Sequence, residues 1–228
     1  YTDGGEVKST TKSVAINDPI QYGVGLLQAD IQVANVSLKD QTDAAYTFVG
    51  FDWSAILIGN QKQVDYEFRQ NTSATVSSII YDKHMSGSVN GDPINVAATG
   101  TAYGPNYTLV LSTADNGATG EAHDDKVYVA VELLNKGAAF FGKDGQLIPA
   151  NAKFYLVGEL KVTSEAGSHP EKFNIFYKDY TTTLHLTVGE NSLKSAYNTI
   201  PDLRSEGLEL GFSVDLSWTP GLEFNVEF

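Results

Sequence analysis

The side chains of this chain that could do chemistry are its histidines, serines and acids, and cysteine is absent. Without cysteine there are no disulfides, zinc–thiolate sites, iron–sulfur clusters or thiol nucleophiles. The four histidines form neither an HxH nor an HExxH pair, and no serine lies in a G-x-S-x-G elbow. Neither a P-loop nor a G-x-G-x-x-G loop is present. We therefore predict a protein that is not an enzyme, with no catalytic residue and no cofactor.

An acidic segment, residues 114–126, is the one candidate for a metal. Its oxygen and nitrogen donors are Asp115, Asn116, Glu121, His123, Asp124 and Asp125. Oxygen-rich loops can bind Ca²⁺, but this spacing does not match an EF-hand. We favour a solvated loop and predict no metal site, with calcium kept as the alternative. Tyr103 and Tyr107 could stack on a sugar if exposed, or pack across strands.

Charge and composition limit the partners. Fifteen basic and 28 acidic residues give a net charge of −13, which disfavours binding to nucleic acid or to an anionic membrane. No run of about 18 apolar residues exists that could span a membrane as a helix, so we expect no direct membrane insertion. The first residues have neither a basic nor an apolar signal region, so we expect that any signal peptide has been removed or lies outside this sequence. Residues 1–20 are polar and predict a loose lead-in.

Alternation of apolar and polar residues with a period of two dominates the chain and predicts strands. It occurs in segments 64–68, 127–133, 154–162 and 184–188, each expected to have its polar side facing solvent. A change of parity near Ala34 and Asn35 predicts a β-bulge, and the apolar segment 48–58 predicts a central strand. Ser192 to Asn198 predicts one or two helical turns capped by Ser192. With turn signals between the strands, the sequence predicts an all-β protein, an antiparallel β-sandwich.

The C-terminal end has the most regular alternation, in two segments separated by Thr219, Pro220 and Gly221. Its apolar residues all lie at even positions: Leu208, Leu210, Phe212, Val214, Leu216, Trp218, Leu222, Phe224, Val226 and Phe228. An apolar chain end needs a groove to lie in. The pattern alone leaves three alternatives. These residues are the last strands of the protein's own sandwich, or strands that add to the sheet of a partner, or an aggregation-prone edge.

The same stretch resembles the C-terminal end of Bacteroidales fimbrillins, the subunits of type V pili, and especially the shaft subunit of the minor fimbrium. The matching string is SLKSAYNTIPDLRSEGLELGFSVDLSWTPGLEFNVEF, residues 192–228. Further matches are AILIGNQKQVDYEF (55–68), AFFGKDGQLIPANAKFYLVGELKV (139–162) and NIFYKDYTTTLHLTV (174–188). The resemblance covers most of residues 30–228.

This resemblance implies a transthyretin-like β-sandwich in a two-domain subunit that is exported as a lipoprotein. An arginine-specific protease then removes an N-terminal strand, and the groove left behind accepts the C-terminal strands of the next subunit. The ten apolar residues above would be the donor strand, in an appendage of residues 208–228 that follows a sandwich domain of residues 1–207. The expected partners are neighbouring fimbrial subunits, with ligands on host or bacterial surfaces as further candidates, and the expected location is an extracellular fimbrium that supports cell adhesion.

The chain departs from this family in lacking the lipobox cysteine and an arginine in its lead-in, since its arginines are Arg69 and Arg204. At 228 residues it is also short for two such domains. We therefore expect the C-terminal domain, with the acceptor groove outside this sequence; a compact processed subunit is the alternative. The competing function is a surface glycan-binding β-sandwich whose C-terminal strands are purely internal.

Overall fold

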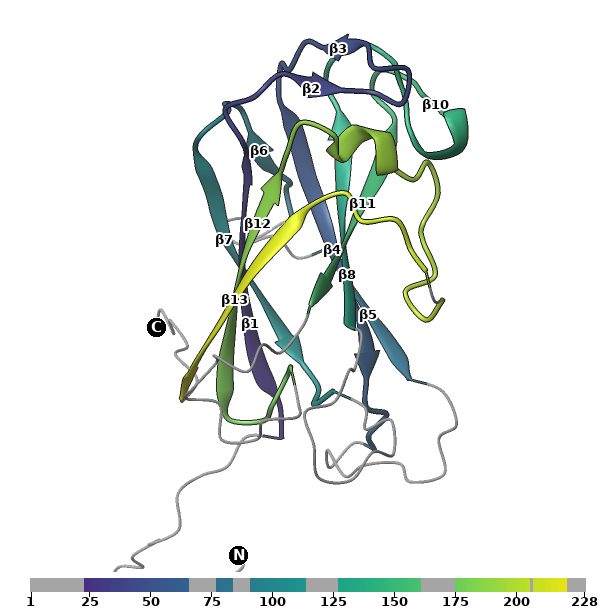
Figure 1. Ribbon diagram of the computed structural model, residues 1–228. Helices are drawn as coiled ribbons and strands as arrows, with labels where there is room; N and C mark the ends of the chain where they lie inside the picture. Colours follow the sequence, from purple (N-terminus) through teal and green to yellow (C-terminus); the bar gives the residue numbers. More distant parts are fainter. Residues whose placement is uncertain are drawn as a thin grey trace, which may run out of the picture.

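The computed structural model describes residues 23–65, 77–83, 91–113, 127–160, 175–205 and 207–220. Two sheets pack face to face as a β-sandwich (Figure 1). Sheet 1 has the order β13-β12-β1-β7, and sheet 2 has the order β11-β8-β4-β5, with β6 also paired to β4. The strands of sheet 1 are β1 (Gly25–Val33), β7 (Ala102–Val110), β12 (Tyr180–Val188) and β13 (Ser213–Pro220). Those of sheet 2 are β4 (Phe51–Gln61), β5 (Ser78–Asp82), β6 (Ile94–Val96), β8 (Val127–Asn135) and β11 (Lys153–Leu160).

Short elements close one end of the sandwich. They are the hairpins β2 (Leu38–Lys39) with β3 (Ala45–Tyr46) and β9 (Phe140–Phe141) with β10 (Leu147–Ile148), and the 3₁₀ helices η1 (Lys143–Gly145) and η2 (Ser192–Ser195). Asn135 ties this end together, because its fully buried side chain makes four hydrogen bonds. It accepts from the Tyr46 hydroxyl at 2.6 Å and the Gly137 amide at 3.0 Å, and donates to the carbonyls of Ala138 at 2.9 Å and Pro149 at 3.0 Å.

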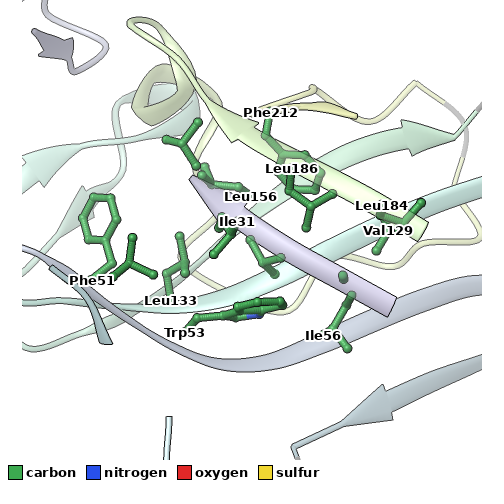
Figure 2. Close-up of a cluster of buried hydrophobic side chains, with 14 of the residues drawn as sticks. Ile31, Phe51, Trp53, Ile56, Val129, Leu133, Leu156, Leu184, Leu186 and Phe212 are labelled. Carbon is green, nitrogen blue, oxygen red and sulfur yellow. The ribbon is translucent and has the colours of Figure 1, made fainter. Parts of the chain in front are cut away.

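The predicted β-sandwich is confirmed, and nearly every pairing is antiparallel. The exception is β1, which runs parallel to β12 with Leu26 opposite Thr181. The core between the sheets comes from alternate residues of the strands, as the period of two requires. Figure 2 shows part of it, with Trp53, Leu156, Leu186 and Phe212 among the labelled side chains. None of the helices in the described ranges has the length and apolar character of a membrane span.

Several local predictions need correction. The predicted bulge at Ala34 and Asn35 is absent, because β1 ends at Val33; the register shift lies between Ala29 and Ile31, in the pairing with β7. The helical turn at Ser192 is a 3₁₀ helix whose cap position is Asn191, without a side-chain hydrogen bond. The Ser192 hydroxyl instead accepts from the Gly189 amide at 2.7 Å. Segment 66–68 of another predicted strand lies outside the described residues.

The prediction that β8 and β11 have a polar, solvent-facing side is also wrong. Their outward side chains Tyr128, Ala130, Glu132, Tyr155 and Val157 are all buried. The reason is that residues 197–205 and 207–208 lie over this outer face, where Leu203 is buried and Tyr197 and Leu208 are partly buried against the same cluster. We call residues 197–205 and 207–208 the covering segment. Near the middle of β8 and β11, one face therefore packs in the main core and the other packs under the covering segment, so neither face is exposed to solvent.

Candidate strand-exchange site

The C-terminal strand β13 lies at the edge of sheet 1, where it pairs antiparallel with β12 (Figure 1). The register places Tyr180 opposite Pro220 and Thr187 opposite Ser213. Since β13 has a neighbour on one side only among the described strands, its attachment there depends on one ladder of backbone hydrogen bonds and on one face of side chains. This is the position in a sheet from which a strand can leave without disrupting any other pairing.

The inward face of β13 is only partly covered. Val214, Leu216 and Trp218 alternate inward and are half-buried; Val214 and Leu216 pack against the main core. The Trp218 indole N–H also donates to the Ile175 carbonyl at 2.9 Å. The residues between them, Ser213, Asp215, Ser217 and Thr219, are exposed. The alternation predicted for this segment is thus present, but its apolar side chains are incompletely removed from water.

Phe212, immediately before β13, is the main anchor of the segment. Its side chain is 6% exposed and belongs to the core between the sheets (Figure 2). It fits there because β11 has a glycine at position 158: a Cβ on Gly158 would come within 2.1 Å of the Phe212 ring. Next to it, the Gly211 amide donates to the Val157 carbonyl at 2.7 Å. The site around Phe212 therefore joins the edge strand of sheet 1 to the edge strand of sheet 2.

Residues 208–212 are not a strand, contrary to the prediction, because they cross from the outer face of sheet 2 to sheet 1. Leu208 is half-buried against the outer cluster, and Leu210 is 45% exposed. The Glu209 amide donates to the Tyr197 hydroxyl at 2.8 Å. The last four predicted donor residues, Leu222, Phe224, Val226 and Phe228, lie outside the described residues, as does the acidic segment 114–126.

On the outer face of sheet 1, His185 of β12 lies between two aspartates. Asp30 of β1 and Asp215 of β13 are its register partners on either side. The His185 Nδ1 atom is 2.6 Å from the Asp30 carboxylate. Within the described ranges, no three histidine or acidic side chains gather in a way that could hold a metal ion.

Glu132 of β8 is the centre of a buried polar cluster that the sequence analysis missed. Its side chain is 1% exposed. Its carboxylate accepts from the Ser54 hydroxyl at 2.7 Å, the Tyr81 hydroxyl at 2.6 Å, the Tyr155 hydroxyl at 2.7 Å and the Lys153 ammonium at 2.6 Å. A single acid in the apolar run of β8 was the signal that could have revealed it.

These contacts decide the protonation states in the cluster. Burial alone would raise the pKa of Glu132, but hydrogen bonds from Lys153, Tyr81, Tyr155 and Ser54 outweigh burial and lower it to about 2. Burial, together with the bond to the Glu132 carboxylate, raises the pKa of Tyr81 to about 12 and raises that of Tyr155 further. Since all four donors point at one carboxylate, we interpret the cluster as a fixed structural element.

The two tyrosines considered for sugar stacking lie on β7. The Tyr103 hydroxyl accepts from the Ala98 amide at 2.9 Å, and its half-buried ring packs against the main core. Tyr107 is 39% exposed, next to Leu109 at 51% two residues along the strand. Tyr103 is therefore a packing residue, whereas Tyr107 has an open face.

Comparison with known proteins gives no family model and no curated protein that matches the chain. Among solved structures, a candidate cell adhesion protein from Bacteroides eggerthii matches with a TM-score of 0.36 and 10% identity, over 88% of this chain and 56% of that one. Two candidate cell adhesion proteins from Parabacteroides distasonis match with TM-scores of 0.36 and 0.37 and with 13% and 15% identity. These matches cover 87% and 86% of this chain, and 53% and 59% of the other chains. The chain thus spans just over half the length of these proteins.

Proposed function

We propose that this chain is a structural subunit of a bacterial surface fimbria, joined to its neighbours by donor-strand exchange through residues 208–228. The fimbria supports cell adhesion, and its subunits reach the surface as lipoprotein precursors. The observation that carries the proposal is the place of β13: in the part of the chain that the structure describes, it is an edge strand with one neighbour, and its apolar face is half-covered. The resemblance of residues 192–228 to the fimbrillin C-terminus points to the same segment.

Incomplete burial supplies a driving force for exchange. Full burial of an aliphatic or aromatic side chain is worth about 1.5–3 kcal/mol, so each half-buried side chain on β13 has about 1 kcal/mol still to gain in a deeper groove. Val214, Leu216 and Trp218 are in this state, and Leu210 is 45% exposed. The backbone hydrogen bonds lost on leaving β12 would be regained on a new strand, as in other cases of strand addition. Exchange is then favourable because of side-chain burial.

Two adjacent residues on opposite faces of β13 allow a matched test in the full-length protein. Leu216→Lys places a charge on the inward face, and Ser217→Lys places the same charge on the exposed face. We expect Leu216→Lys and a deletion of residues 208–228 to abolish filaments in electron micrographs of the bacterium, whereas Ser217→Lys leaves them in place. Surface export, checked by immunoblot, must be equal in all strains.

Normal filaments in the deletion strain would refute the proposal. The competing function, a glycan-binding sandwich, rests on the open face of Tyr107 and does not need the tail. Binding of the soluble protein to a glycan array, lost in Tyr107→Ala and unchanged by the deletion, would favour that function instead.

A further inference from the structure

We infer that the groove which β13 fills in its own sheet also accepts the same segment from a second copy of this chain, so that two chains exchange residues 208–220 and form a strand-swapped dimer. This goes beyond the proposed function, in which the segment enters a groove outside this chain. Any departure of β13 leaves an open edge on β12 and an empty space beside Gly158. The same segment of a second copy can then refill both.

The groove is specific for this segment in two ways. The exposed edge of β12 offers the register of eight residue pairs that β13 occupies. At its end, the Phe212 ring occupies the space that the missing side chain of Gly158 leaves open, since a Cβ there would lie 2.1 Å from the ring. The Val157 carbonyl marks the same point by accepting from the Gly211 amide. A second copy of the chain carries the same Gly211, the same Phe212 and the same apolar residues of β13, so its segment fits the groove equally well.

The chain also contains a hinge at which the segment can swing out. Before the hinge, a turn is fixed by the Ser205 amide donating to the Asp202 carbonyl at 2.9 Å, and by Arg204, whose Nε lies 2.8 Å from the Asp202 carboxylate. After this turn, Gly207 has a φ of +72° and nothing within 4 Å of the position that a Cβ would take. In the closed chain, position 207 is thus in the left-handed region that glycine adopts without strain, whereas an extended connection between two copies would take a negative φ.

A cysteine pair reads out the exchange directly, because the chain has no cysteine of its own. Thr183→Cys on β12 and Ser217→Cys on β13 face each other, so their disulfide joins two chains in a swapped dimer and stays within one chain in a monomer. The control pair is Gln32→Cys with Thr187→Cys, opposite each other on β1 and β12, where the native side chains are 3.2 Å apart. Both proteins are refolded at low and at high concentration and run on non-reducing gels.

We expect a covalent dimer that increases with refolding concentration for Thr183→Cys/Ser217→Cys, and only covalent monomer for the control pair. Gly207→Ala should then raise the association constant, because alanine disfavours the left-handed conformation of the closed monomer and not the open one. At about fivefold for each of two hinges, the increase is about 25-fold. Gly189→Ala is the matched control, since the space around Gly189 is equally open and its φ is not in the left-handed range.

Disulfides that stay within one chain at every concentration would overturn the inference, whether or not Gly207→Ala folds. So would equal association constants, by sedimentation equilibrium, for Gly207→Ala and Gly189→Ala. Neither result bears on filament formation, which the deletion of residues 208–228 tests separately.

Discussion

The substitution Gly158→Ala should weaken the attachment of Phe212 and β13, which we call the tail, to the rest of the sandwich. In Gly158→Ala, the added Cβ would lie 2.1 Å from the ring of Phe212, so the ring must leave its site. Phe212 is 6% exposed, and its expulsion forfeits about 2–3 kcal/mol of burial. Alanine in a strand otherwise gains about 0.5–1 kcal/mol over glycine, because glycine loses more backbone entropy on folding. The net expected destabilisation of tail attachment is about 2 kcal/mol.

A second substitution separates this mechanism from general damage to β11. Phe212→Ala alone should cost about 3 kcal/mol, since it removes a buried ring. In the Phe212→Ala background there is no ring left to expel, so Gly158→Ala should be neutral or stabilising by about 0.5–1 kcal/mol. The coupling between the two positions is therefore about 2–3 kcal/mol, well above the error of a double-mutant cycle.

The two tryptophans of the chain make the assay specific for the tail. Trp218 lies on β13, and Trp53 is fully buried in the core. With Trp53→Phe, urea titration followed by fluorescence reports detachment of β13; with Trp218→Phe, it reports unfolding of the sandwich. Gly158→Ala should move the first transition to lower urea more than the second. Equal costs of Gly158→Ala with and without Phe212 would refute the reasoning.

Three further predictions concern Glu132, Tyr81 and Asn135. The pKa of the Glu132 carboxylate falls from 4.5 to about 2 on folding, so its ionised form stabilises the fold by up to about 3 kcal/mol above pH 4.5. This stabilisation is lost as the pH falls toward 2. The difference in unfolding free energy between wild type and Glu132→Gln, measured by urea titration, should therefore shrink over that range. Tyr81, whose pKa rises from 10 to about 12, stabilises the fold fully below pH 10 and progressively less above it. Tyr81→Phe should thus lose less stability than wild type between pH 10 and 12, measured as thermal midpoint. Asn135→Ala should cost about 2–4 kcal/mol, since it leaves several buried groups unpaired, while Asn95→Ala, at an exposed hydrogen bond to Asp52, should cost under about 1 kcal/mol.

Local alternation was enough to predict the strands but not what covers them. The period of two in segments 127–133 and 184–188 placed β8 and β12 correctly, and the apolar segment 48–58 foretold the central strand β4. The outer face of sheet 2 could not be predicted, because the covering segment is distant in sequence and has no strand pattern of its own. Long-range packing of this kind leaves no periodic signal.

The candidate site was predictable to a similar extent. The even-numbered apolar row located β13, but Thr219 and Pro220, predicted to separate two segments, lie within the strand opposite Thr181 and Tyr180. The pattern could not distinguish Phe212, a buried anchor, from Leu210, which is 45% exposed. That difference arises from the chain crossing between sheets before Ser213. Gly158, in the middle of an apolar strand, was the one local sign of a close approach.

The parallel pairing of β1 with β12 has a mechanical consequence. Because β13 runs antiparallel to β12, the start of β1 and the end of β13 lie at the same end of the sandwich: Leu26, Thr181 and Thr219 are neighbours across three strands. Tension applied between Gly25 and Pro220 would break the backbone hydrogen bonds between β12 and β13 one after another, starting at Pro220. It would not shear all of them at once. A small force would then detach β13 from β12, and the buried contact of Phe212 would be the last to break.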